Sequence, residues 1–229
     1  MPQTPILALP FPSESDPADV PTDIQELAAR VEAVRGAPDG LASLDASGQL
    51  PATQRPPVAM VTALPASPAD GTEVILCDSV SGPAYAWRLR WNATDARWQF
   101  VGGTSYRATV ATSETMTTVG AWTNLATIGP RLTIPRAGDY LVRFGATLID
   151  SAAESQANLG IGIGDFASPA LVEARGHISA ANYHLSVSTE AVVTGLAAGA
   201  ELRVKYLHQI ASTYTALQRW LAIQPTRLL

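Results

Sequence analysis

Three histidines, His177, His184 and His208, are the side chains here best suited to acid–base chemistry or metal binding. No two of them stand two or four residues apart, the spacings that place paired metal ligands on one face of a strand or helix. The single cysteine, Cys77, excludes an intramolecular disulfide and a cysteine-rich metal site. We therefore expect no cofactor and no metal. The alternative left open is a metal site formed at a trimer axis by three copies of one histidine.

Carboxylates are the other candidates for catalysis, because a glycosidase needs two of them at a controlled separation. The sequence has no nucleophile elbow, P-loop, zinc-protease or dinucleotide-binding motif, and glycine-rich residues 160–166 have the pattern of a strand. The acids after residue 130 that could supply such a pair are Asp139, Asp150, Glu154, Asp165, Glu173, Glu190 and Glu201. Most of them stand beside turn residues or strand ends, where solvated charge is common. We therefore expect that the chain is not an enzyme, and a polysaccharide-degrading spike is the less favoured alternative.

Aromatic and polar residues in the predicted loops of the C-terminal half suit the binding of sugars. Aromatic faces can pack on sugar rings, and amides can hydrogen-bond to hydroxyl groups. Loops carried by a rigid β scaffold are the usual place for such contacts. The receptor-binding candidates are Trp122, Asn124, Asn182, Tyr183, His184 and Tyr214.

Residues 104–229 must supply the scaffold for these loops, and their pattern is that of short strands. Apolar and polar residues alternate over 139–149 and 201–209, and turn signals such as 136–139 separate the runs. Eight to ten strands in this length predict an antiparallel sandwich or jelly roll.

Three segments of this region resemble one superfamily of jelly rolls. RLTIPRAGDYLVRFGATL (131–148) is similar to the entry strand of tumour-necrosis-factor-like and complement-globular-head domains, and VVTGLAAGAELRVKYLHQ (192–209) to a later strand. The apolar closing strand LQRWLAIQPTRL (217–228) also fits. The resemblance implies a jelly-roll head that assembles as a compact trimer, and it transfers no binding site.

Residues 59–103 form a predicted small β module. Tyr85, Trp87, Leu89 and Trp91 alternate with polar residues on one strand, and a return strand follows a turn at 92–95. The clustered aromatic residues suit either a sugar-stacking platform or the core of a small sheet, and we favour the core. The segment 70–103 resembles a small β module recurrent in phage tail and spike proteins.

Residues 22–36 predict a short helix that self-associates. Thr22 and Gln25 form a capping box, and Gly36 can end the helix. Apolar residues spaced by three, four and three form a two-heptad seam that is too short to hold alone. β-Branched seam residues are compatible with more than two strands, and we expect a trimeric coiled coil. The seam residues are Ile24, Leu27, Val31 and Val34.

The segments on either side of this helix are rich in proline or glycine. Residues 1–21 contain six prolines, lack the basic region of a secretory signal, and yet carry apolar residues that suit docking on a larger partner. Residues 37–58 read as a linker, and GLASLDASGQLPATQ (40–54) resembles a segment common in tail-fibre and spike proteins of tailed bacteriophages. The proposed virion-attachment residues are Ile6, Leu7, Leu9 and Phe11.

The net charge and the small number of charged residues limit the classes of partner that the chain can bind. Only 15% of the 229 residues are charged, and 20 acids against 15 bases give a net charge of −5, which disfavours nucleic acid. Residues 1–35 hold −4 of this charge, and so the rest of the chain is nearly neutral. A sparsely charged body predicts an oligomer that buries much of its surface. No apolar run is long enough to span a bilayer, and we expect no membrane insertion.

These observations predict a mainly β structural protein of the virion surface, assembled in the host cytoplasm. The homotrimer is expected to attach through its N-terminus to tail, baseplate or capsid proteins and to recognise a host-surface glycan through its head. A tail fibre or spike is the first interpretation. A capsid-decorating fibre of the same architecture is the alternative.

Overall fold

The computed structural model describes residues 20–34, 57–167 and 171–229. Val58–Leu229 form one compact unit, and the helix α1 (Val20–Val34) belongs to the other, Met1–Pro57. The helix begins two residues before the predicted start and ends two residues before the predicted end, within the usual uncertainty of helix boundaries. No helix in the described ranges is long and apolar enough to cross a bilayer.

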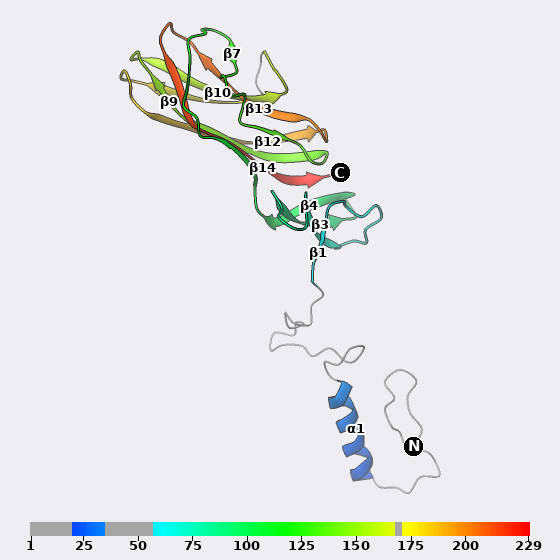
Figure 1. Ribbon diagram of the computed structural model, residues 1–229. Coiled ribbons are helices and arrows are strands. Elements are labelled where there is room, and N and C mark those ends of the chain that lie inside the picture. The colour runs from blue at the N-terminus through cyan, green and yellow to red at the C-terminus, as the bar shows by residue number, and fades with distance from the viewer. Residues whose placement is uncertain (1–19, 35–56, 168–170) are drawn as a thin grey trace. The chain divides into compact units, whose positions relative to one another are not determined.

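All other regular structure in the described residues is β (Figure 1). The strands are β1 (Ala59–Val61), β2 (Glu73–Cys77), β3 (Ala86–Asn92), β4 (Arg97–Gly103), β5 (Tyr106–Val110), β6 (Glu114–Met116), β7 (Trp122–Thr123), β8 (Arg131–Thr133), β9 (Gly138–Asp150), β10 (Ser155–Ile163), β11 (Val172–Ile178), β12 (Leu185–Leu196), β13 (Glu201–His208) and β14 (Tyr214–Leu228).

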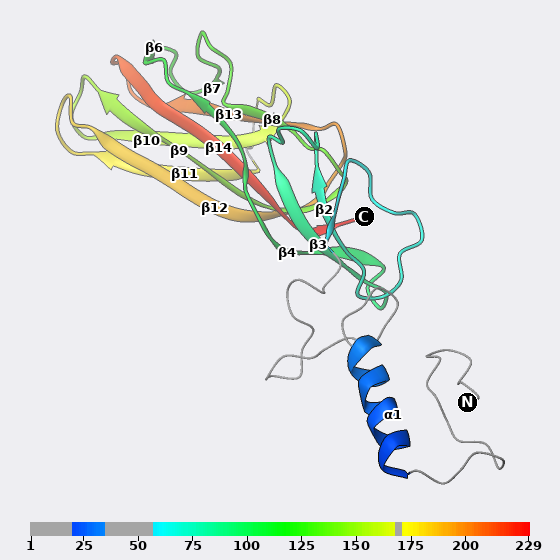
Figure 2. The same ribbon diagram turned by 60° about the horizontal axis from the view of Figure 1, so that its bottom comes forward.

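The strands form two sheets. The larger runs β1-β2-β3-β4-β14-β9-β12, with β5 and β6 also paired to β14, and the smaller runs β11-β10-β13-β7, with β8 also paired to β13. Figure 2 shows β14, β9 and β12 in one layer of the head and β10 and β13 in the other. From β9 to β14 the chain crosses between the layers at every connection except the β10–β11 hairpin, and every strand pair except β1–β2 is antiparallel. This strand order is that of a jelly roll, and so the predicted mainly β fold with a C-terminal sandwich is confirmed.

The larger sheet crosses the predicted boundary at residue 103. β14 is 15 residues long, and its last residues pair with β4 through Arg227–Gln99 and Leu228–Trp98. The strands β1–β4, which we call the shoulder, therefore extend the same sheet that forms one layer of the head.

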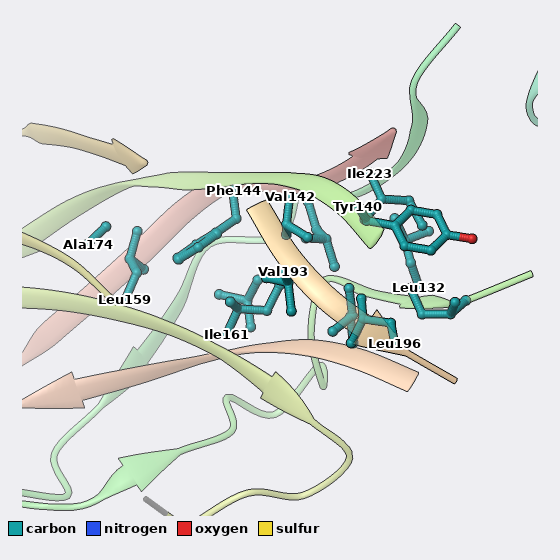
Figure 3. Close-up of a cluster of buried hydrophobic side chains, with 14 of the residues drawn as sticks. Leu132, Tyr140, Val142, Phe144, Leu159, Ile161, Ala174, Val193, Leu196 and Ile223 are labelled. Atoms are coloured by element: carbon teal, nitrogen blue, oxygen red, sulfur yellow. The ribbon is translucent and has the colours of Figure 1, made fainter. Parts of the chain in front are cut away.

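The core of the head lies between the two layers. Strands β9 and β13 largely alternate buried and more exposed positions, and their buried residues face one another across the sandwich. Residues 141, 143, 147 and 149 of β9 point to the outer face instead. Figure 3 shows the buried cluster from both layers, with Leu132, Tyr140, Val142, Phe144, Leu159, Ile161, Ala174, Val193, Leu196 and Ile223 labelled.

The shoulder has a core of its own aromatic residues. Trp87 and Trp98 are buried, and Trp87 contacts Tyr140 of the head edge-on, with ring centroids 6.0 Å apart. Trp91 packs edge-on against Trp98 at 5.5 Å and is only partly covered. Most of the tryptophan surface here is therefore used for packing, as the favoured interpretation of the sequence expects.

Candidate functional site

The end of the head opposite the shoulder gathers three loops. β9 has its Gly138 end beside the shoulder-bound end of β14, and so its Asp150 end lies at the far side of the sandwich. The loops 151–154, 179–184 and 209–213 all follow strands that end there, and we call them the far-end loops.

Asp150 ties the far-end loops together. Its carboxylate Oδ1 accepts hydrogen bonds from the backbone N–H of Ala152 at 2.9 Å and from the hydroxyl of Ser212 at 2.5 Å. Its backbone carbonyl accepts the N–H of Asn182 at 2.6 Å. Ser151 and Thr213 add two hydrogen bonds between the first and third loops. One buried residue therefore positions all three loops.

Asp150 and His208 are a fully buried pair. Both side chains have 0% exposure, and His208 Nε2 lies 3.0 Å from Asp150 Oδ2. Burial acts to raise the pKa of Asp150, but the hydrogen bonds that its carboxylate accepts from Ala152 and Ser212 oppose this effect, and the pKa lies below its usual value. The carboxylate is therefore ionised at neutral pH and fixes the loops as an anion.

The Ser212–His208–Asp150 cluster does not have the geometry of a hydrolase triad. A triad uses one ring nitrogen for the nucleophile and the other for the carboxylate. Here Ser212 Oγ, at 2.8 Å, and Asp150 Oδ2, at 3.0 Å, contact the same nitrogen, Nε2. His208 Nδ1 has no hydrogen-bond partner in the described residues. The cluster therefore positions loops and offers no proton relay to a nucleophile.

Three sequence-predicted receptor residues are exposed on one far-end loop. Tyr183 is 56% exposed, and Asn182 and His184 beside it are also exposed. Asn182 has a left-handed backbone, with φ of 59°, which its N–H bond to Asp150 holds in place. A phenol, an amide and an imidazole are thus presented together on an anchored turn. Such a set can stack on a sugar ring and exchange hydrogen bonds with its hydroxyls.

The other three candidates have packing roles within the chain. Tyr214 is fully buried and stacks on His208 with centroids 5.2 Å apart, because β14 turns its side chain into the sandwich. Trp122 is 9% exposed and packs against Phe166 on the outer face of the smaller sheet. Asn124 donates to Asp165 at 2.9 Å. Three of the six candidates therefore lie on an exposed loop, Trp122 and Tyr214 are buried, and Asn124 is half-buried and bonded to an exposed carboxylate.

The predicted seam of α1 is exposed along the described helix. Ile24 is 59% exposed, Leu27 40% and Val31 36%. The side chain of Val34 lies outside the described positions, and so do the proposed attachment residues Ile6, Leu7, Leu9 and Phe11.

The sequence reading missed two conspicuous residues on β14. The register of β14 against β9 slips by one residue between Leu217 and Trp220, and Gln218 in this bulge has a left-handed φ of 51°. Arg219 therefore points into the sandwich, while Trp220 lies on the outer face of the larger sheet, beside Gly145. An unbroken alternation is the default for a strand, and the sequence carries no glycine to mark this bulge.

Arg219 is fully buried, and two of its three guanidinium nitrogens, Nη1 and Nη2, have partners in the described residues. Its guanidinium donates to the carbonyls of Thr127 and Thr112, each at 3.2 Å, and lies 3.1 Å from Glu114. Burial acts to raise the pKa of Glu114, but hydrogen bonds from Thr127 and the charge of Arg219 outweigh it and lower that pKa.

Among the described residues, no group of three or more His, Cys, Asp and Glu side chains gathers to hold a metal ion.

Comparisons with known proteins found no matching family model and no matching curated protein. Among solved structures, the chain is similar to a TNF protein, Eiger, from S. frugiperda, with 12% identity and a TM-score of 0.31 over 51% of this chain and 91% of the other. It is similar to the globular domain of zebrafish complement 1qA protein, with 13% identity and a TM-score of 0.31 over 51% of this chain and 97% of the other.

A third similarity is to a family two carbohydrate esterase from Cellvibrio japonicus, with 16% identity and a TM-score of 0.23 over 55% of this chain and 36% of the esterase. The jelly roll described above is taken from the strand order.

Proposed function

We propose that this chain forms a homotrimeric fibre or spike on the surface of a bacteriophage particle. The observation that carries the proposal is the exposed apolar seam of α1. Ile24, Leu27 and Val31 follow coiled-coil spacing and are exposed on a 15-residue helix that is too short to be stable alone in water. Association with copies of itself gives this stripe a partner.

The head offers a second surface for the same association. On the outer face of the larger sheet, Gly145, Ser188 and Ala222 place small or no side chains around Trp220. A hollow lies beside the Trp220 ring, and the ion pair between Arg143 and Glu190, with N–O distance 2.8 Å, lines it. Aromatic residues are enriched where subunits pack together, and small residues around one let the facing subunit approach closely.

The place on a virion is supported by the sequence of the N-terminal third. Residues 40–54 resemble the segment that joins attachment and distal parts in phage fibres, and residues 1–21 carry apolar residues among prolines. In this proposal the N-terminal segment attaches to tail, baseplate or capsid proteins, and the head points outward. The chain acts by binding and not by catalysis.

Receptor recognition is assigned to the far-end loops. Asn182, Tyr183 and His184 are exposed there on a turn anchored by the buried Asp150. A trimer presents three copies of this loop, and so a weak affinity for one glycan unit becomes a strong attachment to a surface that displays many.

Sedimentation velocity of the full chain tests the trimer. The wild type is expected to sediment as a trimer of 24.0 kDa subunits. Leu27→Asp places a charge in the seam and is expected to shift the chain to smaller species. Ala29→Asp is the matched control, because residue 29 lies on the opposite side of the helix and is also exposed. A wild-type chain that sediments as a stable monomer contradicts the proposal.

Antibody labelling of purified phage particles in the electron microscope tests where on the particle the protein lies. Label on tails supports a tail fibre or spike, and label on heads supports the capsid-decorating alternative. Particles that carry no label contradict a virion role.

A further inference from the structure

A polar hollow of about 530 Å³ lies on the shoulder, away from the far-end loops. It is formed where the turn at 69–72 meets the end of the β3–β4 hairpin. Its volume is in the range of small-molecule sites. The polar side chains that line it are Asp70, Arg90, Asn92, Thr94 and Gln99.

The backbone around this hollow is fixed by short hydrogen bonds. The N–H of Gly71 donates to the carbonyl of Trp91 at 3.0 Å, and the N–H of Trp91 donates to the carbonyl of Thr72 at 2.9 Å. Asp70 Oδ1 accepts the N–H of Ala93 at 2.9 Å, which joins the turn to the hairpin. The two sides of the hollow are therefore held together without a ligand.

The polar side chains are held by partners as well. Arg90 donates through Nε and Nη2 to Glu73 Oε1, at 3.0 and 2.7 Å, while Arg88 donates to the other oxygen of the same carboxylate. Gln99 Nε2 donates to Asp95 at 3.2 Å. A ligand that enters the hollow does not have to order these side chains, and so it loses less free energy on binding than it does at a mobile surface.

Asn92 is engaged at both ends by Asp95, and each of the other four polar side chains that line the hollow has one polar group without a partner in the part of the chain that the structure describes. Within the described residues, no hydrogen bond engages Asp70 Oδ2, Gln99 Oε1, Arg90 Nη1 or the hydroxyl of Thr94. Two of these groups only accept, one only donates and one does both. A ligand with several neighbouring hydroxyl groups can satisfy all four, because each hydroxyl both donates and accepts.

We propose that this hollow binds one neutral saccharide unit. Arg90 and Arg88 share the carboxylate of Glu73, and Asp70 on the turn supplies a second negative charge. These four groups carry no net charge, and so an anionic ligand gains little at this hollow. The choice of a glycan rests on the proposed function, but the site lies on the shoulder and is separate from the far-end loops. Each subunit of a trimer would then contact host glycans at two sites, the far-end loops and the shoulder hollow.

Saturation-transfer NMR on the full-length chain tests the site with glucose, galactose, mannose and N-acetylglucosamine as probes. At least one sugar is expected to bind and to change the tryptophan fluorescence, because Trp91 lines the hollow. Gln99→Ala and Asp70→Asn are expected to weaken that sugar about tenfold each. Asp70→Asn keeps an oxygen for the N–H of Ala93, and so it preserves the turn.

Two further variants separate this site from others. Gln156→Ala removes an exposed amide from β10 and is the control for Gln99→Ala, with no loss of binding expected. Tyr183→Ala removes the exposed aromatic residue of the far-end loops and is expected to leave the shoulder site intact. Thermal melting of each variant checks that it is folded.

Binding of none of the four sugars overturns the proposal, and so does loss with Tyr183→Ala but not with Gln99→Ala. Loss with Gln99→Ala and Asp70→Asn alone supports it. Sedimentation of the same samples measures the oligomeric state separately, and so it distinguishes a failure of the proposed trimer from a failure of the proposed shoulder site. A monomer that binds sugar at the hollow would contradict the trimer and leave the shoulder site standing.

Discussion

Buried polar residues hold the head together at its far end. Asp150 and His208 are fully buried, Ser212 is partly buried, and close polar contacts join the three side chains. Burying a carboxylate is costly unless polar partners replace its water, and Ala152, Ser212 and His208 are these partners. The exposed loop that carries Tyr183 depends on it.

Asp150→Asn is expected to lower the free energy of unfolding at pH 7 by about 3 kcal/mol, because one partner of a buried pair is lost. The pKa of Asp150 lies below its unfolded value of about 3.9. Its contribution is therefore present above pH 4 and is lost as pH falls through the lower folded pKa. Urea unfolding at pH 7 and at pH 3 is expected to show the variant approaching the wild type at the lower pH.

Glu173→Gln is the control for this prediction. Glu173 pairs with Arg175 at the surface, and the loss of this pair is expected to cost less than about 1 kcal/mol. Equal losses from Glu173→Gln and Asp150→Asn would show that burial does not strengthen the Asp150 pair.

At the scale of elements, β14 does most to organise the chain. It pairs with β9, β5, β6 and β4, and its bulge separates an inward Arg219 from an outward Trp220. Without the extra residue, one of the two faces of the strand would be inverted beyond Gln218. The bulge therefore places a buried ionic pair and an outer aromatic patch on consecutive residues.

Arg219→Met is expected to lower stability by about 3 kcal/mol, because Glu114 and two carbonyls lose a buried donor. Combining it with Glu114→Gln is expected to cost less than the sum of the single losses, since the second change removes the uncompensated charge. Thermal unfolding of the four proteins in this cycle measures the coupling. Strict additivity would show that the two side chains do not interact.

Alternation of apolar and polar residues located most strands of the head from the sequence. The prediction over 139–149 differs from β9 by one residue at each end, because one face of that strand is buried throughout. The same rule does not locate β6 and β7. These strands have three and two residues, which is too few to show an alternation.

The candidate site was predicted only in part, for a related reason. Turn residues showed that 182–184 are in a loop, and a loop residue is exposed unless something covers it. The burial of Tyr214 depends on which way β14 faces, and the covering of Trp122 depends on Phe166, 44 residues later. Neither relation is local. The shoulder hollow needs a turn and a hairpin brought together across 20 residues, which no motif encodes.

At the scale of the whole molecule, the chain combines one compact β unit with an N-terminal part whose one described helix is too short to be stable alone. All the buried contacts described above, including the shoulder core and the Asp150 cluster, lie within Val58–Leu229. The helix seam lies in the other unit. Folding of the head and the proposed association through the helix are therefore expected to depend on different residues.

A fragment that begins at Val58 tests this separation. It is expected to fold with the β signal of the full chain in circular dichroism, because its core is intact. Its self-association is expected to be weaker, since only the face around Trp220 is left to drive it, and its attachment to a glycan-coated surface should fall with the lost valency. Sedimentation and surface binding of both proteins give the comparison. An unfolded fragment would show that the N-terminal part is required for the head to fold. A folded fragment that trimerises as strongly as the full chain would assign association to the head alone.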